Sequence, residues 1–99
     1  EMVSLGAVEK KIQDTQVLEG CDYVVTSIPD AAKGEKIVLV YQGEKDESTV
    51  VSELRSSGMP PLMIPSLAMN VEAVPKLGTG KADFTTAKKM VIEMLANKR

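Results

Sequence analysis

The chain has 99 residues, a length that suits one small domain with a single hydrophobic core. Its 43% hydrophobic and 26% charged residues are typical of a globular protein and argue against disorder. The net charge of −2 gives no support to non-specific nucleic-acid binding. The chain has no histidine and one cysteine, Cys21, which excludes a Ser-His-Asp or Cys-His arrangement, an internal disulfide and the common metal sites.

The first part of the chain predicts a helix followed by a strand. Ser4 suits the N-cap of a helix that runs to about Gln13, because its hydroxyl can accept a hydrogen bond from a backbone N–H of the first turn. The apolar face of that helix would consist of Leu5, Val8 and Ile12. Residues 21–28 are rich in β-formers and predict a strand. We expect Pro29-Asp30 to end this strand, because proline cannot donate a hydrogen bond to a ladder.

The middle of the chain predicts a second strand and a second helix. Residues 36–42 contain an uninterrupted apolar run, which suggests a strand that is buried on both faces or lies at the centre of a small sheet. After a polar loop, a helix is predicted from about Ser48, which can cap it, to Ser57. Its inward-facing residues would be Val50, Val51 and Leu54.

The last part predicts a third strand and a long helix. Residues 68–74 alternate apolar and polar side chains, as a half-buried strand does. Asp83 can cap a helix that runs to about Asn97. The apolar stripe of this helix would be Phe84, Ala87, Met90, Val91, Met94 and Leu95. The order α-β-β-α-β-α contains no repeat, so we expect one α+β domain with a small three-stranded sheet flanked by helices.

The strongest chemical signal lies just before the last helix. Gly78 and Gly80 allow the main chain to approach a ligand, and the ammonium of Lys81 suits carboxylate or phosphate oxygens. The segment is not a phosphate-binding P-loop, because Pro75 stands where that motif needs glycine and Ala82 where it needs Ser or Thr. On local sequence alone, a simple strand-to-helix turn with a solvated lysine is the commoner role for such a segment.

Three motifs in order along the chain point to a family. Pro75-Lys76-x-x-Thr79-Gly80-Lys81 resembles the last core motif of adenylate-forming enzymes, the superfamily of acyl-CoA synthetases, nonribosomal-peptide adenylation domains and luciferases. Val3-Ser4-Leu5-x-x-Val8-Glu9 is similar to a second core motif. Ile28-Pro29-Asp30-x-x-Lys33-Gly34-Glu35 resembles the family's turn between two strands. Each motif alone is weak, but the three together are fairly specific, and the resemblance covers essentially the whole chain.

The resemblance implies that the chain is the small, mobile C-terminal domain of a larger ligase, without its large N-terminal domain and hinge. The start at Glu1 also favours a piece cut from a longer protein. In that superfamily the lysine aligned with Lys81 contacts the carboxylate substrate and nucleotide oxygens, so Lys81 is the expected catalytic residue. Gly78, Thr79 and Gly80 are expected beside the nucleotide. ATP and Mg²⁺ would be bound mainly by the large domain, so the 99 residues alone are expected to be inactive.

The resemblance also implies a second working position of the domain. After adenylation the family's C-terminal domain rotates and presents the opening motif to the thiol acceptor. Val3, Ser4 and Leu5 are therefore expected beside the tunnel of that thiol. The motif is divergent here, because Leu5 stands where proline is usual and Ala7 where glutamate is usual.

One branch of the superfamily matches more closely. Met2-Val3-Ser4-Leu5-x-x-Val8-Glu9 and Leu77-Gly78-Thr79-Gly80-Lys81-x-Asp83-Phe84 resemble the bifunctional bacterial acyl-[acyl-carrier-protein] synthetase/2-acylglycerophosphoethanolamine acyltransferases. That branch implies a fatty acid substrate, acyl-carrier protein as acceptor, and a parent protein at the cytoplasmic face of the bacterial inner membrane. Two alternatives stay open: an acyl-CoA synthetase that uses coenzyme A, and a non-catalytic α+β binding module.

Overall fold

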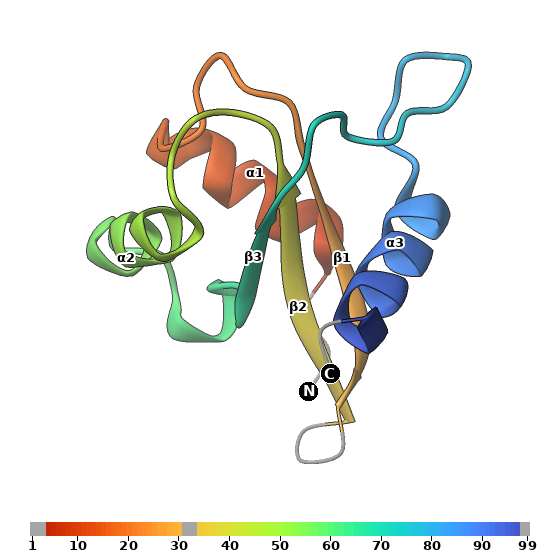
Figure 1. Cartoon of the computed structure of the whole chain (residues 1–99). Coiled ribbons are helices and arrows are strands. Elements are labelled where there is room, and N and C mark those ends of the chain that lie inside the picture. Colours follow the sequence, from red (N-terminus) through yellow and green to blue (C-terminus); the bar gives the residue numbers. More distant parts are fainter. Residues whose placement is uncertain (1–3, 31–33, 98–99) are drawn as a thin grey trace.

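The structure is a three-stranded sheet with helices on both faces (Figure 1). It is a computed structural model that describes residues 4–30 and 34–97. Its elements are α1 (Leu5–Thr15), β1 (Tyr23–Asp30), β2 (Gly34–Tyr41), α2 (Glu47–Ser56), a 3-10 turn η1 (Pro61–Met63), β3 (Leu67–Asn70) and α3 (Phe84–Asn97). This confirms the predicted α+β class and the order α-β-β-α-β-α, with η1 as the one addition.

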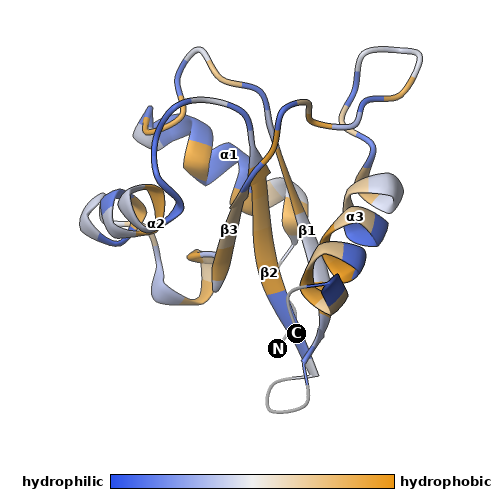
Figure 2. Ribbon diagram, in the orientation of Figure 1, coloured by the Kyte–Doolittle hydropathy of each residue, from blue (hydrophilic) through white to orange (hydrophobic). Residues whose placement is uncertain are grey.

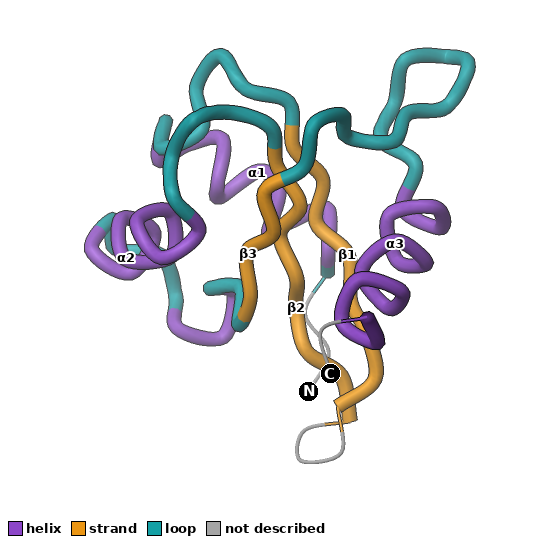
Figure 3. Tube along the Cα trace, in the orientation of Figure 1, coloured by secondary structure: helices purple, strands orange, loops and turns teal. Residues whose placement is uncertain are grey.

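The sheet has the order β1-β2-β3 and mixes both kinds of pairing (Figure 3). β1 and β2 form an antiparallel hairpin in which Tyr23 pairs with Tyr41. β2 and β3 run parallel, with Leu39 opposite Ala68. β2 is therefore the central strand, and its last four residues are all buried. The uninterrupted apolar run predicted this position correctly, because only a strand covered on both faces needs apolar side chains at every residue.

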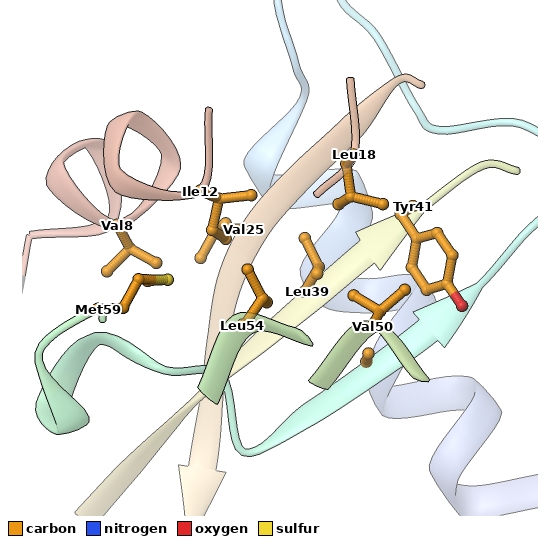
Figure 4. Packing of buried hydrophobic residues seen from close by; sticks show 10 residues of the cluster. Val8, Ile12, Leu18, Val25, Leu39, Tyr41, Val50, Leu54 and Met59 are labelled. Atoms are coloured by element: carbon orange, nitrogen blue, oxygen red, sulfur yellow. The ribbon is translucent and has the colours of Figure 1, made fainter. Parts of the chain in front are cut away.

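Each face of the sheet packs against its own helices. On one face, α1 and α2 share a cluster with the sheet that includes Val8, Ile12, Val25, Leu39, Tyr41, Val50, Leu54 and Ala68 (Figure 4). On the other face, α3 contributes Ala87 and Val91 to a cluster with Val24, Ile28, Val38, Val40 and Met69. Figure 2 shows the hydrophobic sides of the helices turned toward the sheet. Burying these two surfaces supplies the main driving force for folding.

The prediction that Pro29-Asp30 ends the first strand is wrong. β1 continues through both residues, and Pro29 pairs with Glu35. β1 is an edge strand, and the Val25 N–H points away from β2, because it donates to a Glu9 carboxylate oxygen at 3.2 Å. Pro29 lies four residues further on and so faces the same way. Its missing N–H therefore costs the ladder nothing.

The ends of α2 and β3 also differ from the predictions. α2 begins at Glu47 with Asp46 in the N-cap position, so Ser48 lies inside the helix and does not cap it. β3 covers only Leu67–Asn70 of the predicted 68–74. Its partner β2 ends at Tyr41, whose carbonyl still accepts a hydrogen bond from the Val71 N–H at 2.9 Å. Beyond that point β2 offers no further residue to pair with, so the alternating pattern does not continue as a strand.

Glu9 fastens α1 to the free edge of β1. Besides the bond from Val25, the Glu9 carbonyl accepts a hydrogen bond from the Tyr23 hydroxyl at 3.1 Å. Partial burial raises the pKa of the Glu9 carboxyl, and the hydrogen bond from the Val25 N–H opposes that rise. The opening motif therefore supplies a structural contact in addition to any functional one.

The Glu9→Gln variant is expected to remove one component of the pH dependence of stability. Because the folded-state pKa lies above the ordinary value of 4.5, protonation favours folding. The contribution of Glu9 is fully present below that value and is lost as pH rises through the folded pKa. Urea unfolding of both proteins between about pH 4 and pH 7 measures this, with glutamine keeping an acceptor for Val25. A wild type that gains stability over the variant as pH rises would contradict the assignment.

Within the described residues, no helix is both long and apolar enough to span a membrane.

Candidate functional site

Lys81 lies on a short hairpin that links β3 to α3. Lys76 and Ala82 pair as an isolated antiparallel bridge, and the Leu77 N–H donates to the Lys81 carbonyl at 2.7 Å. The Gly80 N–H donates to the Leu77 carbonyl at 2.8 Å. This pattern is a three-residue hairpin loop closed by a bulge at Gly80, which has a φ of 91°. Figure 1 shows this Lys81 hairpin (residues 74–83) beyond the end of the sheet where β2 and β3 finish.

The two glycines of the hairpin have different roles. Gly80 occupies the left-handed region, which closes the turn and is costly for other residues. Gly78 does not have a positive φ, and a Cβ at this position would meet no atom within 4 Å. The structure of the chain therefore requires glycine at position 80 and not at position 78.

Gly80→Ala is expected to destabilise the chain by about 1–2 kcal/mol, because alanine must adopt a left-handed conformation. Gly78→Ala is the matched control and is expected to change the free energy of unfolding by less than about 0.5 kcal/mol. Urea unfolding of both variants measures the difference. Equal losses at the two positions would contradict the bulge geometry.

Asp83 joins the hairpin to α3, as its predicted role as N-cap requires. Its Oδ1 accepts a hydrogen bond from the Thr86 N–H at 3.1 Å, and its Oδ2 accepts one from the Thr86 hydroxyl at 2.7 Å. These hydrogen bonds lower the pKa of the Asp83 carboxyl. The Asp83 N–H also donates to the Pro75 carbonyl at 3.1 Å, which closes the base of the hairpin. The second arm of the hairpin thus runs directly into a capped helix.

Lys81 is exposed and forms no salt bridge with another residue in the described part of the chain. Leu77 and Phe84, on either side of it in sequence, are 49% and 41% exposed. The prediction that Phe84 belongs to the buried stripe of α3 is therefore wrong, because the helix begins at Phe84, where the chain is still leaving the hairpin. An exposed cation between apolar side chains can meet an anion on another surface without first breaking an ion pair.

Two contacts fix the first arm of the hairpin to the sheet, and the sequence predicts neither. The Val74 N–H donates to Gln42 Oε1 at 2.6 Å, and Lys76 Nζ lies 2.8 Å from Asp22 Oδ2. The partners are 32 and 54 residues apart along the chain. No local pattern indicates such contacts, because they arise only where the sheet brings the residue before β1 and the residue after β2 together.

The opening motif lies away from the hairpin. The Ser4 hydroxyl accepts a hydrogen bond from the Ala7 N–H at 3.4 Å, which confirms Ser4 as the N-cap of α1. Leu5 packs against the cluster of Figure 4, and Val3 lies outside the described residues. Figure 1 shows α1 beginning near the lower half of β1, whereas the hairpin stands beyond its upper end. The domain therefore does not assemble Lys81 and the opening motif into one site.

The described residues of the third motif lie at the paired ends of β1 and β2. Asp30 pairs with Gly34 and Pro29 with Glu35, so both sides of the motif lie in the antiparallel ladder. Lys33 lies outside the described residues. The described residues of this motif therefore belong to two paired strands, as the resemblance implies.

No protein-family model matches the chain. Solved structures of several ligases do contain its fold. The chain resembles the AMP-forming acyl-CoA synthetase/AMP-acid ligase II-like protein of Dyadobacter fermentans, with a TM-score of 0.70, 23% identity and coverage of 90% of this chain and 26% of that one. For an acyl-CoA synthetase of Brucella canis these values are 0.77, 17%, 94% and 18%. For a fatty acyl CoA synthetase of Mycobacterium tuberculosis they are 0.74, 22%, 91% and 18%.

These likenesses establish the fold. The small α+β arrangement is that of the C-terminal domain of adenylate-forming enzymes, as the three motifs implied. The chain spans about a quarter or less of the length of these solved proteins.

Proposed function

We propose that the chain is the C-terminal domain of an ATP-dependent, adenylate-forming acyl ligase in which Lys81 supplies the cation for adenylation. One observation carries the proposal. An exposed lysine that has no carboxylate partner among residues 4–30 and 34–97 stands on a hydrogen-bonded hairpin, in a fold that solved acyl-CoA synthetases share. The bridge and the bulge hold the backbone of this lysine in a defined position.

The chemistry needs a cation of this kind. A carboxylate oxygen attacks the α-phosphorus of ATP, a bond to phosphorus forms, and pyrophosphate leaves with the electron pair of the broken bond. The step brings two anionic groups together, and a positioned ammonium offsets their repulsion in the transition state. Lys81 would meet the carboxylate and the phosphate oxygens, while the rest of the site lies on the large domain.

Fewer residues of the glycine-rich tip are free to contact the nucleotide than the sequence predicts. The Gly80 N–H already donates to the Leu77 carbonyl, so it is not free to bind a nucleotide oxygen. Gly80 acts by shaping the turn. Gly78 and Thr79 remain the residues of the tip that would lie beside the nucleotide.

Magnesium would be held by ATP and the large domain. In residues 4–30 and 34–97, no group of three or more metal-ligating side chains could bind a metal ion. In the proposed division of roles, the large domain binds ATP and Mg²⁺ and the small domain supplies the lysine.

We further propose fatty acid as the carboxylate substrate and acyl-carrier protein as the acceptor. The segments around Ser4 and Lys81 support this branch, and the parent protein would then act at the cytoplasmic face of the bacterial inner membrane in lysophospholipid re-acylation. Coenzyme A is the competing acceptor, and a non-catalytic binding module is the competing function.

The test is fatty-acid-dependent exchange of labelled pyrophosphate into ATP by the complete polypeptide that carries this domain. Exchange that requires fatty acid supports the proposal, and the yields of thioester on acyl-carrier protein and on coenzyme A then identify the acceptor. A folded protein that shows no exchange with any carboxylic acid would leave the binding module as the function.

A further inference from the structure

Asp22 and Gln42 form a clamp at the base of the Lys81 hairpin. Asp22 directly precedes β1 and Gln42 directly follows β2, and the Gln42 N–H donates to the Asp22 carbonyl at 2.9 Å. The two side chains reach from this joined pair to the first arm of the hairpin, where they bind the Val74 N–H and the Lys76 ammonium. Residues at one end of the sheet thus bind the first arm at Val74 and at Lys76.

The position of Lys81 follows from the clamped arm. The second arm is bonded to the first through the Lys76–Ala82 bridge and through the Asp83 N–H to the Pro75 carbonyl. Lys81 is one residue from that bridge, and its backbone carbonyl accepts the Leu77 N–H. A change in the direction of the first arm therefore moves Lys81 with it.

We propose that Asp22 and Gln42 are positioning residues that aim Lys81 during adenylation. This inference rests on the proposed function. The Lys81 ammonium stands at the end of a four-carbon stem, so a small tilt of the arm at its base displaces the ammonium further than the backbone. A misplacement of about 1 Å can lower the rate of a positioned reaction by about a hundredfold.

The Lys76–Asp22 ion pair of the clamp is expected to contribute little to the free energy of unfolding. The side chains of Lys76 and Asp22 are 44% and 51% exposed, and such exposed pairs contribute little to folding. The chain also offers a matched control. Lys45 and Glu53 form a pair at 2.7 Å with exposures of 44% and 43%, and neither residue belongs to the hairpin or its base. A loss of exchange activity that follows substitution of Asp22 but not of Glu53 would therefore indicate that Lys81 has moved.

The experiment compares variants of the complete polypeptide. Asp22→Asn and Gln42→Ala are expected to lower kcat for fatty-acid-dependent ATP–pyrophosphate exchange by between about 10- and 100-fold, while KM for ATP changes less than about threefold. Gln42→Glu keeps an acceptor for the Val74 N–H and is expected to retain most activity. The exchanged pair Asp22→Lys with Lys76→Asp is expected to recover much of the loss. Glu53→Gln is expected to stay within about twofold of wild type.

A second readout separates positioning from general damage. Transfer of the acyl group from preformed acyl-adenylate to the thiol does not use the aim of Lys81, so it is expected to stay within about twofold in Asp22→Asn. The thermal midpoint of that variant is expected to shift by no more than about 2 °C.

The outcomes distinguish the two proposals. If Lys81→Ala abolishes exchange but Asp22→Asn and Gln42→Ala leave it near wild type, the clamp has no positioning role and the proposed function stands. If transfer falls as much as exchange, the clamp supports the fold in general and the inference is wrong. If Lys81→Ala itself leaves exchange intact, both proposals fail.

Discussion

Replacing Lys81 by alanine in the complete polypeptide is expected to slow fatty-acid-dependent ATP–pyrophosphate exchange by about a hundredfold or more. This corresponds to roughly 3 kcal/mol of transition-state stabilisation, the size expected when one group that stabilises developing charge is removed. Lys81 is exposed and without an ion-pair partner among the described residues, so its loss leaves no buried charge and breaks no structural contact with a side chain. The expected effect is therefore catalytic, with the free energy of unfolding near that of wild type.

Two further variants sharpen the Lys81 experiment. Lys11→Ala removes an exposed lysine from α1, away from the hairpin, and is expected to leave exchange unchanged. Lys81→Arg keeps the charge but spreads it over a planar guanidinium, so intermediate activity is expected. Exchange near the wild-type rate in a folded Lys81→Ala protein would reduce the hairpin to a structural turn.

The largest expected effect on stability comes from Leu54→Ala. Leu54 is 0% exposed and belongs to the cluster in which α1 and α2 pack on the sheet (Figure 4). Truncating it removes buried methyl groups and leaves a cavity, which costs about 2–5 kcal/mol. Because a small domain is stable by only about 5–15 kcal/mol, this loss is a large fraction of the total. Urea unfolding of the chain measures it.

Leu62→Ala is the control for this stability prediction. It makes the same chemical change at a side chain that is 68% exposed, so a loss below about 0.5 kcal/mol is expected. Similar losses at the two positions would mean that Leu54 does not lie in a packed core. The difference between the two variants is more informative than either value, since both share the same unfolded-state reference to a first approximation.

The sequence predicted well what depends on neighbours along the chain. Ser4 and Asp83 cap their helices as expected, because a cap is a contact between residues three apart. The central position of β2 was equally readable, since burial on both faces leaves an unbroken apolar run. The catalytic role of Lys81 rests on motifs that require only the order of residues in the hairpin, and it stays a prediction.

The predictions from sequence are wrong where an element that is distant along the chain determines the local structure. Pro29 stays in β1 because β2 pairs on its other side, so its missing N–H faces the open edge of the sheet. β3 stops at Asn70 because β2 has ended at Tyr41. Phe84 is exposed because the hairpin before it leads away from the sheet. Each of these outcomes depends on which element packs beside the segment, and the sequence of the segment alone does not indicate its neighbour.

By itself, the sequence determined the fold class, the order of the elements and the candidate cation at Lys81, because periodicity, capping and short motifs are local properties of the chain. Only the tertiary structure decided how that cation is held. Asp22 and Gln42 reach the hairpin across 54 and 32 residues, and they meet it because the pairing of β1 with β2 places both at one end of the sheet. Hydrogen bonds between such distant residues become possible only after the chain has paid the entropy of forming the sheet.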